Sequence, residues 1–387
     1  MDFSYTPQQE TLRNLVRDFA QKEIAPKAAE LDRTGEFDRS LIPKLYQRGL
    51  LGVVIPKEYG GQGASHIDQA IIVEGLAYES MMVLVLNLAW AMPYELYRVG
   101  TEENRKRWLR YLFDGKKLGA HAGSEADAGT DAASLRCWAE LKDDHWVING
   151  TKFWVSNLEV ADYYFLTLRT SPDRYGGIST IIVEKGTPGM TIGRRINLVS
   201  NRTISNGELI LENCRVPKEN LIGRLGHGFY DMLLLYDVIR CYLAAGAVGL
   251  SQRAFDEAVK FAQERKQFGK PIGDFQLVRA MIADMATEIE AARLLTYKAL
   301  LLEEKGVRHT RETSMCKLYA SETAERVTDK ALHIHGGYGL TTDYPIERLW
   351  RDSKLLTIGE GTSELQRLII AWDIFKSGKI VLDSALD

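Results

Sequence analysis

Two long helical patterns meet at the run Arg265-Lys266-Gln267-Phe268-Gly269-Lys270-Pro271-Ile272. Apolar residues recur at helical spacing from Phe229 to Glu264 before this run, and from Phe275 to Lys305 after it. A third pattern of the same kind covers Thr310 to His333. Helices of such length pack side by side, so the sequence predicts a helical bundle domain over residues 227–387.

The middle of the chain has a different period. From Leu118 to about Leu225 apolar and polar residues alternate in short runs, as in strands with one buried face. The predicted strands are Trp138–Leu141, His145–Ile148, Tyr163–Leu168, Ser179–Val183 and Glu208–Leu211, with turn signals at Asp143-Asp144, Asn149-Gly150 and Gly176-Gly177. The sequence therefore predicts a middle antiparallel β domain over residues 118–226.

The first part of the chain is helical again. Apolar stripes follow Thr6 and Ser65, and Thr101 precedes two glutamates as a helix cap should. We expect an N-terminal helical domain over residues 1–117. The fold class is then α+β multidomain, with helices, a sheet and a helical bundle in that order.

Composition excludes several classes of protein. The 387 residues are 45% hydrophobic, and 49 Lys+Arg against 52 Asp+Glu give a net charge of −3, which does not favour a nucleic-acid partner. The four cysteines form no CxxC pair, so free thiols in a reducing compartment are expected. The stretch Met81–Met92 is too short to span a bilayer, and the amino terminus does not resemble a signal peptide. These features predict a soluble cytoplasmic protein without a membrane span.

Two clusters in the middle domain are candidates for ligand binding. The run Ser124–Asp131 combines hydroxyls, a glycine and small residues, which suits an anion or a polar ring edge, although such clusters are more often surface turns. Trp154 and Ser156 would share one face of a strand, where an indole beside a hydroxyl suits a flat heteroaromatic cofactor. Core packing is the alternative for Trp154.

The bundle carries two more candidate groups. Arg265 at a helix corner suits a phosphate, with a solvated basic corner as the alternative. His333 and His335 are spaced by two residues, which is wrong for one helix face, and no carboxylate completes a ligand set, so no metal site is predicted. The following Gly336-Gly337 pair is interpreted as a helix end that opens onto a ligand.

Glu360 lies between Gly359 and Gly361. A carboxylate on such a bent backbone can project into a cleft, where an apolar setting raises its pKa and makes it a proton acceptor near neutral pH. A capping box is the alternative, because Thr362 or Ser363 can begin a helix whatever Glu360 does.

Together and in this order, these clusters resemble the acyl-CoA dehydrogenase family over Thr6 to Phe375, most closely its bacterial short-, medium- and branched-chain members. The most specific parts are Arg265–Gly269, the stretch from Gly336 to Asp352, and Glu360–Glu364. The resemblance implies an N-terminal helical domain, a middle β domain and a four-helix bundle, assembled as a homotetramer (a dimer of dimers) with FAD between the domains.

The resemblance also assigns roles to single residues. It makes Glu360 the catalytic base that removes the α-proton of an acyl-CoA thioester, while the flavin N5 accepts the β-hydride and an electron-transferring flavoprotein takes the electrons. FAD contacts are implied for His121, Ser124, Thr130, Trp154, Ser156, Thr362 and Glu364, and, from the partner subunit, for Arg265, Phe268, Gln276, His333, Gly336 and Gly337. Substrate contacts are implied for Thr130, Tyr236, Asp237, Arg240, Gly359 and Gly361.

Four positions depart from the family pattern. Gly123 replaces an aliphatic residue, Ala126 a proline, His333 a glutamine or acid, and Gly359 a tyrosine directly before the base. The last change removes an aromatic wall from the substrate cavity, unless Trp90, Tyr94 or Trp372 fills it, and favours a branched or cyclic acyl group. An enoyl-CoA reductase of the same fold, an acyl-CoA oxidase and a non-catalytic flavin-binding protein are the alternatives.

Overall fold

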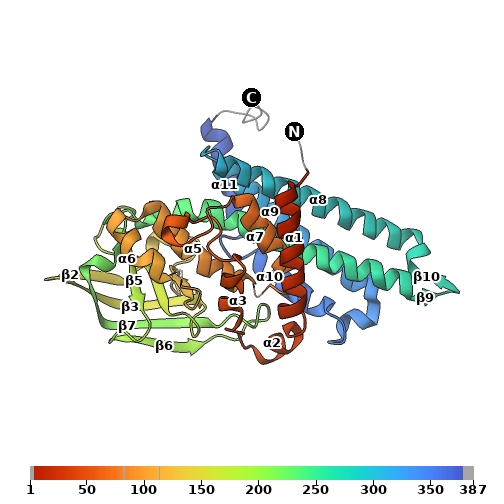
Figure 1. Cartoon of the computed structure of the whole chain (residues 1–387), viewed down its shortest axis with the longest axis horizontal. Helices are drawn as coiled ribbons and strands as arrows, with labels where there is room; N and C mark the ends of the chain where they lie inside the picture. The colour runs from red at the N-terminus through yellow and green to blue at the C-terminus, as the bar shows by residue number, and fades with distance from the viewer. Residues whose placement is uncertain (1–3, 82, 113, 378–387) are drawn as a thin grey trace.

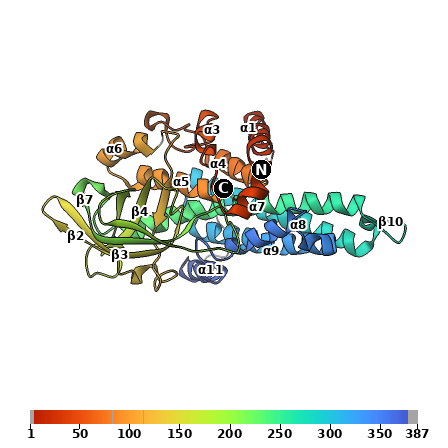
Figure 2. The ribbon, with the colours of Figure 1, turned by 90° about the horizontal axis from the view of Figure 1, so that it is seen from below.

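The computed structural model describes residues 4–81, 83–112 and 114–377, with the backbone alone at 83–90 and 377. The sheet and the far end of the helical bundle lie at opposite ends of an elongated molecule (Figure 1). The N-terminal helices lie along one side of both (Figure 2). These helices and the bundle share one hydrophobic core, whereas most of the sheet packs around a separate core.

The N-terminal helices begin at side-chain caps that the sequence indicates. Thr101 Oγ1 accepts a hydrogen bond from Asn104 N (3.1 Å), and Asn104 Oδ1 accepts one from Thr101 N (3.0 Å), which confirms the predicted cap. Thr6 and Ser65 cap their helices in the same reciprocal way. The helices are α1 (Pro7–Phe19), α2 (Ala28–Thr34), α3 (Leu41–Gln47), α4 (His66–Ala77), α5 (Val83–Val99) and α6 (Glu102–Leu112).

All five predicted strands are present, but the sheet is mixed. Its strands are β1 (Gly119–Ala122), β2 (Trp138–Lys142), β3 (His145–Ser156), β4 (Tyr163–Arg169), β5 (Ile178–Glu184), β6 (Met190–Arg195), β7 (Asn206–Pro217) and β8 (Leu221–Ile222). Most neighbours are antiparallel, whereas β1 and β2 each pair with β4 in parallel. The purely antiparallel domain predicted from the sequence is therefore wrong in this detail. The β2–β3 hairpin lies between β1 and β4 along the chain and supplies the long connection that a parallel pair needs.

The turn predicted at Asn149-Gly150 is also wrong. β3 continues through both residues, with register shifts against β7 between Ile148 and Gly150 and again between Lys152 and Val155. Gly150 has a φ of +134°, and a Cβ there would lie 2.8 Å from Cys137 Cα. The glycine thus serves a bulge and a close backbone approach. The turn at Asp143-Asp144 is confirmed, because Lys142 pairs with His145 across it.

The three long helices of the bundle are confirmed as α7 (Gly228–Glu264), α8 (Gln276–Glu304) and α9 (Thr310–His335). The short hairpin of β9 (Lys266–Gln267) and β10 (Lys270–Pro271) joins α7 to α8. Two more helices follow, α10 (Ile346–Leu356), which was not predicted, and α11 (Ser363–Ser377).

α7 is the central helix of the bundle. It is long and apolar enough to cross a membrane, but 78% of its most apolar window is buried inside the fold, so it is best described as a core helix. Cys241 on α7 faces Cys316 on α9, with 3.9 Å between the two sulfurs. All four cysteines are buried free thiols.

Candidate active site

The loop between α10 and α11 presents Glu360 in a left-handed conformation, with a φ of +55°. Its carbonyl oxygen accepts a hydrogen bond from Arg240 Nε at 2.8 Å, and the next carbonyl, of Gly361, accepts one from Lys317 Nζ at 2.7 Å. Both cationic side chains are buried, Arg240 on α7 and Lys317 on α9. A non-glycine residue seldom adopts a positive φ unless its surroundings enforce it. The two helices therefore hold the loop in this conformation.

The backbone at position 361 favours glycine. Its φ is +94°, and a Cβ there would lie 2.8 Å from Gln366 Nε2 and 3.2 Å from Arg240 Nη2. The tight loop is what allows the Arg240 guanidinium to approach the main chain.

Burial dominates the electrostatics of the Glu360 carboxyl. It raises the pKa of Glu360 above its ordinary value, and the nearby charges of Arg240 and Lys317 offset part of that rise. Burial also lowers the pKa of Lys317 to about 8. Glu360 is thus a stronger base than an exposed glutamate.

One wall beside Glu360 is built by Tyr236 of α7 and His121 of β1. The Arg240 guanidinium lies 5.2 Å from the centre of the Tyr236 ring, and the His121 ring meets that ring edge-on at 6.4 Å. Burial raises the pKa of Tyr236, and the charge of Glu360 adds to the rise. Burial lowers the pKa of His121 to about 4, so its ring is neutral, with Nε2 3.2 Å from Thr167 Oγ1. The structure therefore brings four of the predicted site residues together.

The His121 ring gives a reason for one departure from the family pattern. A Cβ on Gly123 would lie 2.8 Å from His121 Cε1. An aliphatic side chain at position 123 would need the space that the imidazole occupies.

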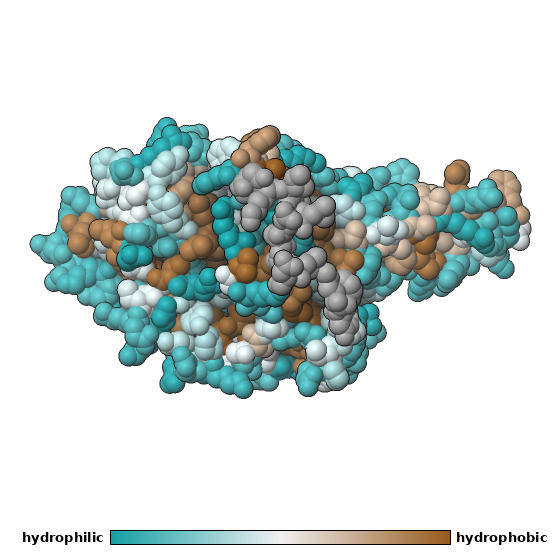
Figure 3. Space-filling model, turned by 90° about the horizontal axis from the view of Figure 1, so that it is seen from above, coloured by the Kyte–Doolittle hydropathy of each residue, from teal (hydrophilic) through white to brown (hydrophobic). Residues whose placement is uncertain are grey.

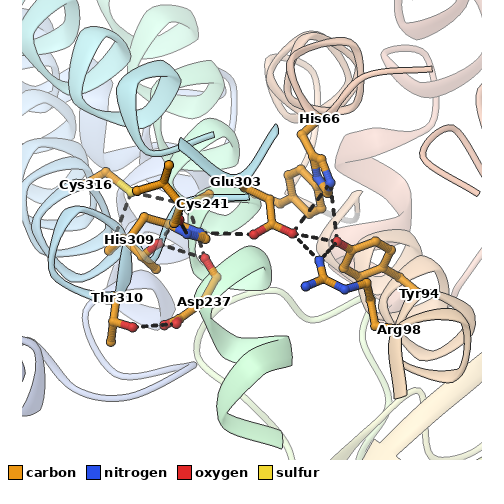
Figure 4. Close-up of polar contacts among 12 residues, drawn as sticks. His66, Tyr94, Arg98, Asp237, Cys241, Glu303, His309, Thr310 and Cys316 are labelled. Carbon is orange, nitrogen blue, oxygen red and sulfur yellow. Dashed lines mark hydrogen bonds and ion pairs between the residues drawn. The ribbon is translucent and has the colours of Figure 1, made fainter. Parts of the chain in front are cut away.

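Asp237 faces away from this wall, toward the start of α9. Its carboxylate accepts a hydrogen bond from Thr310 Oγ1 at 2.7 Å, and burial raises the pKa of Asp237 (Figure 4). His309 and Glu303 lie beside it, with 3.6 Å between His309 Nε2 and Glu303 Oε2. The Asp237 carboxylate, which was predicted to contact the substrate, is therefore already hydrogen-bonded within the chain.

Glu303 is the centre of the polar cluster in Figure 4. Tyr94 donates its hydroxyl to Glu303 Oε1 at 2.8 Å, and the Arg98 guanidinium forms an ion pair with the same oxygen. Burial opposes ionisation, but the hydrogen bond from Tyr94 and the charge of Arg98 outweigh it, so the pKa of Glu303 is lowered. The cluster ties α5 to the end of α8.

The loop predicted to border a cofactor lies against the predicted aromatic residues. Ser124 O accepts a hydrogen bond from Phe153 N at 2.9 Å. Trp154 has a φ of +60° and a side chain that is 53% exposed, while Ser156 Oγ accepts a hydrogen bond from Asn206 Nδ2 at 3.0 Å. Trp154 and Ser156 do not lie on a regular strand face as predicted, because the bulge between Lys152 and Val155 interrupts the alternation. Thr130 is exposed further along the loop.

A buried ion pair that sequence reasoning missed fixes this loop. Lys152 is fully buried, and its Nζ donates to Gly123 O and to Glu125 Oε1, both at 2.9 Å. Glu125 also accepts from the main-chain N–H groups of Arg136 and Cys137. Burial opposes ionisation, but these contacts outweigh it and lower the pKa of Glu125. The signal that could have revealed this ion pair is the register of the strand, which turns the Lys152 side chain inward.

The cofactor contacts predicted to come from the partner subunit gather at the end of the molecule opposite the sheet. The Arg265 guanidinium lies 5.2 Å from the centre of the Tyr338 ring, and the Phe268 ring lies 6.0 Å from that of Phe275. The six predicted residues here are all exposed: Arg265, Phe268, Gln276, His333, Gly336 and Gly337. The β9–β10 hairpin lies far from the sheet (Figure 1). A single chain therefore does not bring the two predicted sets of cofactor contacts together.

The two histidines near this end do not share a site. His333 is exposed and its Nδ1 lies 2.9 Å from Asp329 O, whereas His335 is buried and stacks on Phe261 with 4.4 Å between ring centres.

Thr362 has the capping role that was the alternative for this segment. Its Oγ1 accepts a hydrogen bond from Leu365 N at 3.3 Å, and α11 begins at Ser363, with Glu364 exposed in its first turn. Helix capping by Thr362 and the projection of Glu360 thus occur together.

A Cβ at Gly359 would make only ordinary van der Waals contacts. The three atoms nearest to a Cβ at this position all belong to Leu355, at 3.4–3.9 Å. Of the three aromatic residues proposed as fillers, Tyr94 is engaged with Glu303, Trp372 is 79% exposed, and the Trp90 side chain lies outside the described residues.

Three family models match the chain in order: the acyl-CoA dehydrogenase N-terminal domain over residues 6–116, the middle domain over 120–214 and the C-terminal domain over 226–375. The chain belongs to the acyl-CoA dehydrogenase family. It is an oxidoreductase that acts on acyl-CoA, and it is a flavoprotein, because members of this family depend on FAD.

Curated relatives of this acyl-CoA dehydrogenase family protein cover nearly its whole length. It is 42% identical to "Acryloyl-CoA reductase (NADH)" of Anaerotignum propionicum (97% of this chain, 96% of the relative). It is 40% identical to "Acyl-CoA dehydrogenase, short-chain specific" of Clostridium acetobutylicum (97% and 100%). It is 37% identical to "3-(aryl)acrylate reductase" of Clostridium sporogenes (96% and 100%).

Solved structures show the same three-domain fold. Butyryl-CoA dehydrogenase from Megasphaera elsdenii superposes with a TM-score of 0.94 at 35% identity, covering 97% of this chain and 100% of that one. A chain of the structure described as "Electron transferring flavoprotein of Acidaminococcus fermentans: Towards a mechanism of flavin-based electron bifurcation" superposes with a TM-score of 0.95 at 37% identity, with the same coverage.

The residues present fit the FAD that the family implies. Trp154 offers an exposed aromatic face on a left-handed residue, next to a loop that the buried Lys152–Glu125 pair fixes. An exposed indole held in this way suits a flat heteroaromatic ring.

Proposed function

We propose that this protein oxidises an acyl-CoA thioester to the 2-enoyl-CoA, with Glu360 as the base that takes the α-proton. The observation that carries the proposal is the anchoring of Glu360 by Arg240 and Lys317 beside the wall of Tyr236 and His121. A base whose pKa is raised toward the working pH removes a proton from a weak carbon acid more effectively.

The charges around Glu360 suit this step. Arg240 and Lys317 use their hydrogen-bond donors on the main-chain carbonyls. Their positive charges still favour the ionised carboxylate before it accepts a proton. The positive φ of Glu360 orients the main chain on which the carboxylate is carried.

The FAD site combines residues from two chains in this proposal. His121, Ser124, Thr130, Trp154, Ser156, Thr362 and Glu364 hold FAD in the same chain, and Arg265, Phe268, Gln276, His333, Gly336 and Gly337 reach it from the partner. When bound, FAD supplies the two-electron acceptor for the β-hydride. Tyr236 and Arg240 flank the CoA chain together with Thr130 in this proposal, and Gly359 and Gly361 border the acyl group. Asp237 is next to Tyr236, but its carboxylate is held by Thr310.

Exposed apolar side chains support a homotetramer built as a dimer of dimers. Phe268, Leu277 and Leu340 are 94%, 80% and 74% exposed, and on α11 Trp372 and Phe375 are 79% and 86% exposed. Figure 3 shows hydrophobic residues along the arm that the bundle forms. Large exposed apolar surfaces mark interaction sites. A cytoplasmic location remains a prediction from the sequence.

The electron acceptor in the proposal is an electron-transferring flavoprotein. The similarity to a chain in a structure of such a flavoprotein supports this choice. The second candidate function is the reverse reaction, reduction of a 2-enoyl-CoA, which the relatives named as an acryloyl-CoA reductase and a 3-(aryl)acrylate reductase favour.

The absence of a side chain at Gly359, where a Cβ would make only ordinary van der Waals contacts with Leu355, supports an acyl group that is bulky near Cα and Cβ. A thin straight chain would leave apolar surface unfilled, at about 0.8 kcal/mol for each methylene. The experiment compares kcat/KM for butyryl-, octanoyl-, isobutyryl-, cyclohexanecarboxyl- and phenylpropionyl-CoA. A preference for butyryl- or octanoyl-CoA would contradict the proposal of a bulky acyl group. If the protein neither oxidises an acyl-CoA nor reduces a 2-enoyl-CoA, the proposed function is contradicted.

A further inference from the structure

A buried carboxyl with one unpartnered oxygen lies near the candidate active site. Glu95 of α5 is 1% exposed, and its Oε1 lies 3.5 Å from Thr180 Oγ1 on β5. Its Oε2 is fully buried and has no hydrogen-bond partner. A buried polar atom without a partner costs free energy, so its presence in a folded protein calls for an explanation.

No cation neutralises Glu95 among the described residues that face it. The charge that acts on it is another carboxylate, Asp231 of α7. Arg98 lines the same narrow cleft, but its guanidinium is paired with Glu303 and Tyr94 (Figure 4). Burial, with Asp231 added, raises the pKa of Glu95 to about 8. At neutral pH Glu95 therefore carries a proton and can donate a hydrogen bond, as neutral acids in apolar sites do.

The cleft beside Glu95 extends along α7 as far as Leu235, the residue before Tyr236. Its other side is formed by Asp231, Leu234 and Leu235, on the helical turns that lead to Tyr236. The Tyr236 phenol lies within electrostatic range of both Glu360 and Glu95, because the charge of each raises its pKa.

We propose that Glu95 donates a hydrogen bond from Oε2 to an oxygen of the acyl-CoA, which makes it a ligand-binding residue for that substrate. This inference rests on the proposed function. The acceptor is a neutral oxygen, either a pantetheine amide carbonyl or an oxygen on the acyl group, because the neighbouring Asp231 disfavours an anion. Leu234 and Leu235 provide the apolar contact on the opposite side of the cleft.

The test measures the binding of three ligands to the FAD-loaded protein by calorimetry. CoA has no acyl group, acetyl-CoA has no β-carbon to oxidise, and acetoacetyl-CoA adds an acyl oxygen. Glu95→Met removes the donor with little change in volume, and we expect Kd to rise about tenfold, which is ~1.4 kcal/mol. Glu95→Gln keeps an N–H donor, and its Kd should stay within about threefold of the original protein. If Glu95→Met does not fold, Glu95→Asp withdraws the carboxyl by one methylene and should give the same loss.

The pattern across the ligands identifies the acceptor. A loss with all three ligands places it on the CoA part, a loss with both acyl thioesters but not with CoA places it on the thioester carbonyl, and a loss with acetoacetyl-CoA alone places it on the additional acyl oxygen. The matched control is Gln69→Met, because Gln69 on α4 is also buried with an unpartnered Nε2, and its Kd values should not change. Unchanged binding of all three ligands by Glu95→Met overturns the inference. Failure of the original protein to bind any of them contradicts the proposed function instead.

Discussion

Arg240 Nε donates a hydrogen bond of 2.8 Å to the main-chain carbonyl of Glu360, a residue 120 positions away in the sequence. Lys317 does the same for the following carbonyl, of Gly361, at 2.7 Å. The main chain that carries the candidate base is therefore held by side chains of α7 and α9. Substitutions in the bundle should thus change catalysis without touching the carboxylate itself.

Arg240→Lys should lower kcat about tenfold, because the shorter, non-planar cation cannot keep the hydrogen bond to the Glu360 carbonyl. FAD content should not change. Arg253→Lys on the same helix is the matched control, since Arg253 pairs with Glu79 and Glu257 away from the loop. Equal kcat values for the two variants would show that Arg240 does not position the base.

The pH dependence of kcat/KM should report the Glu360 carboxyl. As a base, the Glu360 carboxyl must be ionised, so kcat/KM should fall as the pH drops through the pKa of Glu360. Burial raises this pKa above the ordinary value of a glutamate. Lys317→Met removes a positive charge that lowers this pKa, so the acidic limb of the pH profile should move to higher pH. If the acidic limb stays in place or moves to lower pH, the charge of Lys317 does not lower the pKa of the group that titrates.

Gly359→Tyr should fill the space beside Glu360 and lower kcat/KM for cyclohexanecarboxyl-CoA about tenfold or more, while butyryl-CoA is affected less. The kcat/KM of Gly359→Ala for cyclohexanecarboxyl-CoA should lie between the values of the original protein and of Gly359→Tyr, because its side chain has one carbon. Steady-state kinetics with both substrates makes the comparison. Equal effects on both substrates would mean that position 359 does not select the acyl shape.

Arg265→Ala should weaken FAD retention and loosen the oligomer together, because in our proposal this arginine reaches the FAD of the partner chain. Gel filtration and flavin absorbance measure the two effects. Arg279→Ala is the control, since Arg279 is an exposed arginine of the same region that pairs with Asp274. If Arg265→Ala keeps its FAD at high salt and its oligomeric state is unchanged, Arg265 is only a solvated side chain at the helix corner.

The sequence predicts the helical parts of the fold well, because their signals are local. The α7 pattern was predicted from Phe229 to Glu264, and the helix begins one residue earlier. The sheet is less predictable, since pairing partners lie far apart in the chain. Asn149-Gly150 has the composition of a turn but lies inside β3, where contact with Cys137 favours glycine.

The sequence singles out Glu360 as the candidate base, but it does not reveal the side chains that hold the loop of this residue. Glu360 is marked by flanking glycines, whereas nothing in the sequence distinguishes the buried Lys317 from an exposed lysine, and Lys152 is marked only by its inward register in the strand. Glu95 was missed for the same reason, because burial depends on tertiary packing. The left-handed conformation of Trp154 arises from a bulge that alternation alone does not predict.

The most direct test of the central claim is anaerobic reduction of the flavin by acyl-CoA substrates in the original protein and in Glu360→Gln. The amide keeps the shape of the side chain but cannot accept a proton. We predict that the original protein loses its yellow colour with at least one acyl-CoA of the panel. Glu360→Gln should bind FAD and acyl-CoA normally but be reduced at least 10²-fold more slowly, the range expected for a general base. Reduction of Glu360→Gln within tenfold of the original rate would contradict the assignment of Glu360 as the base.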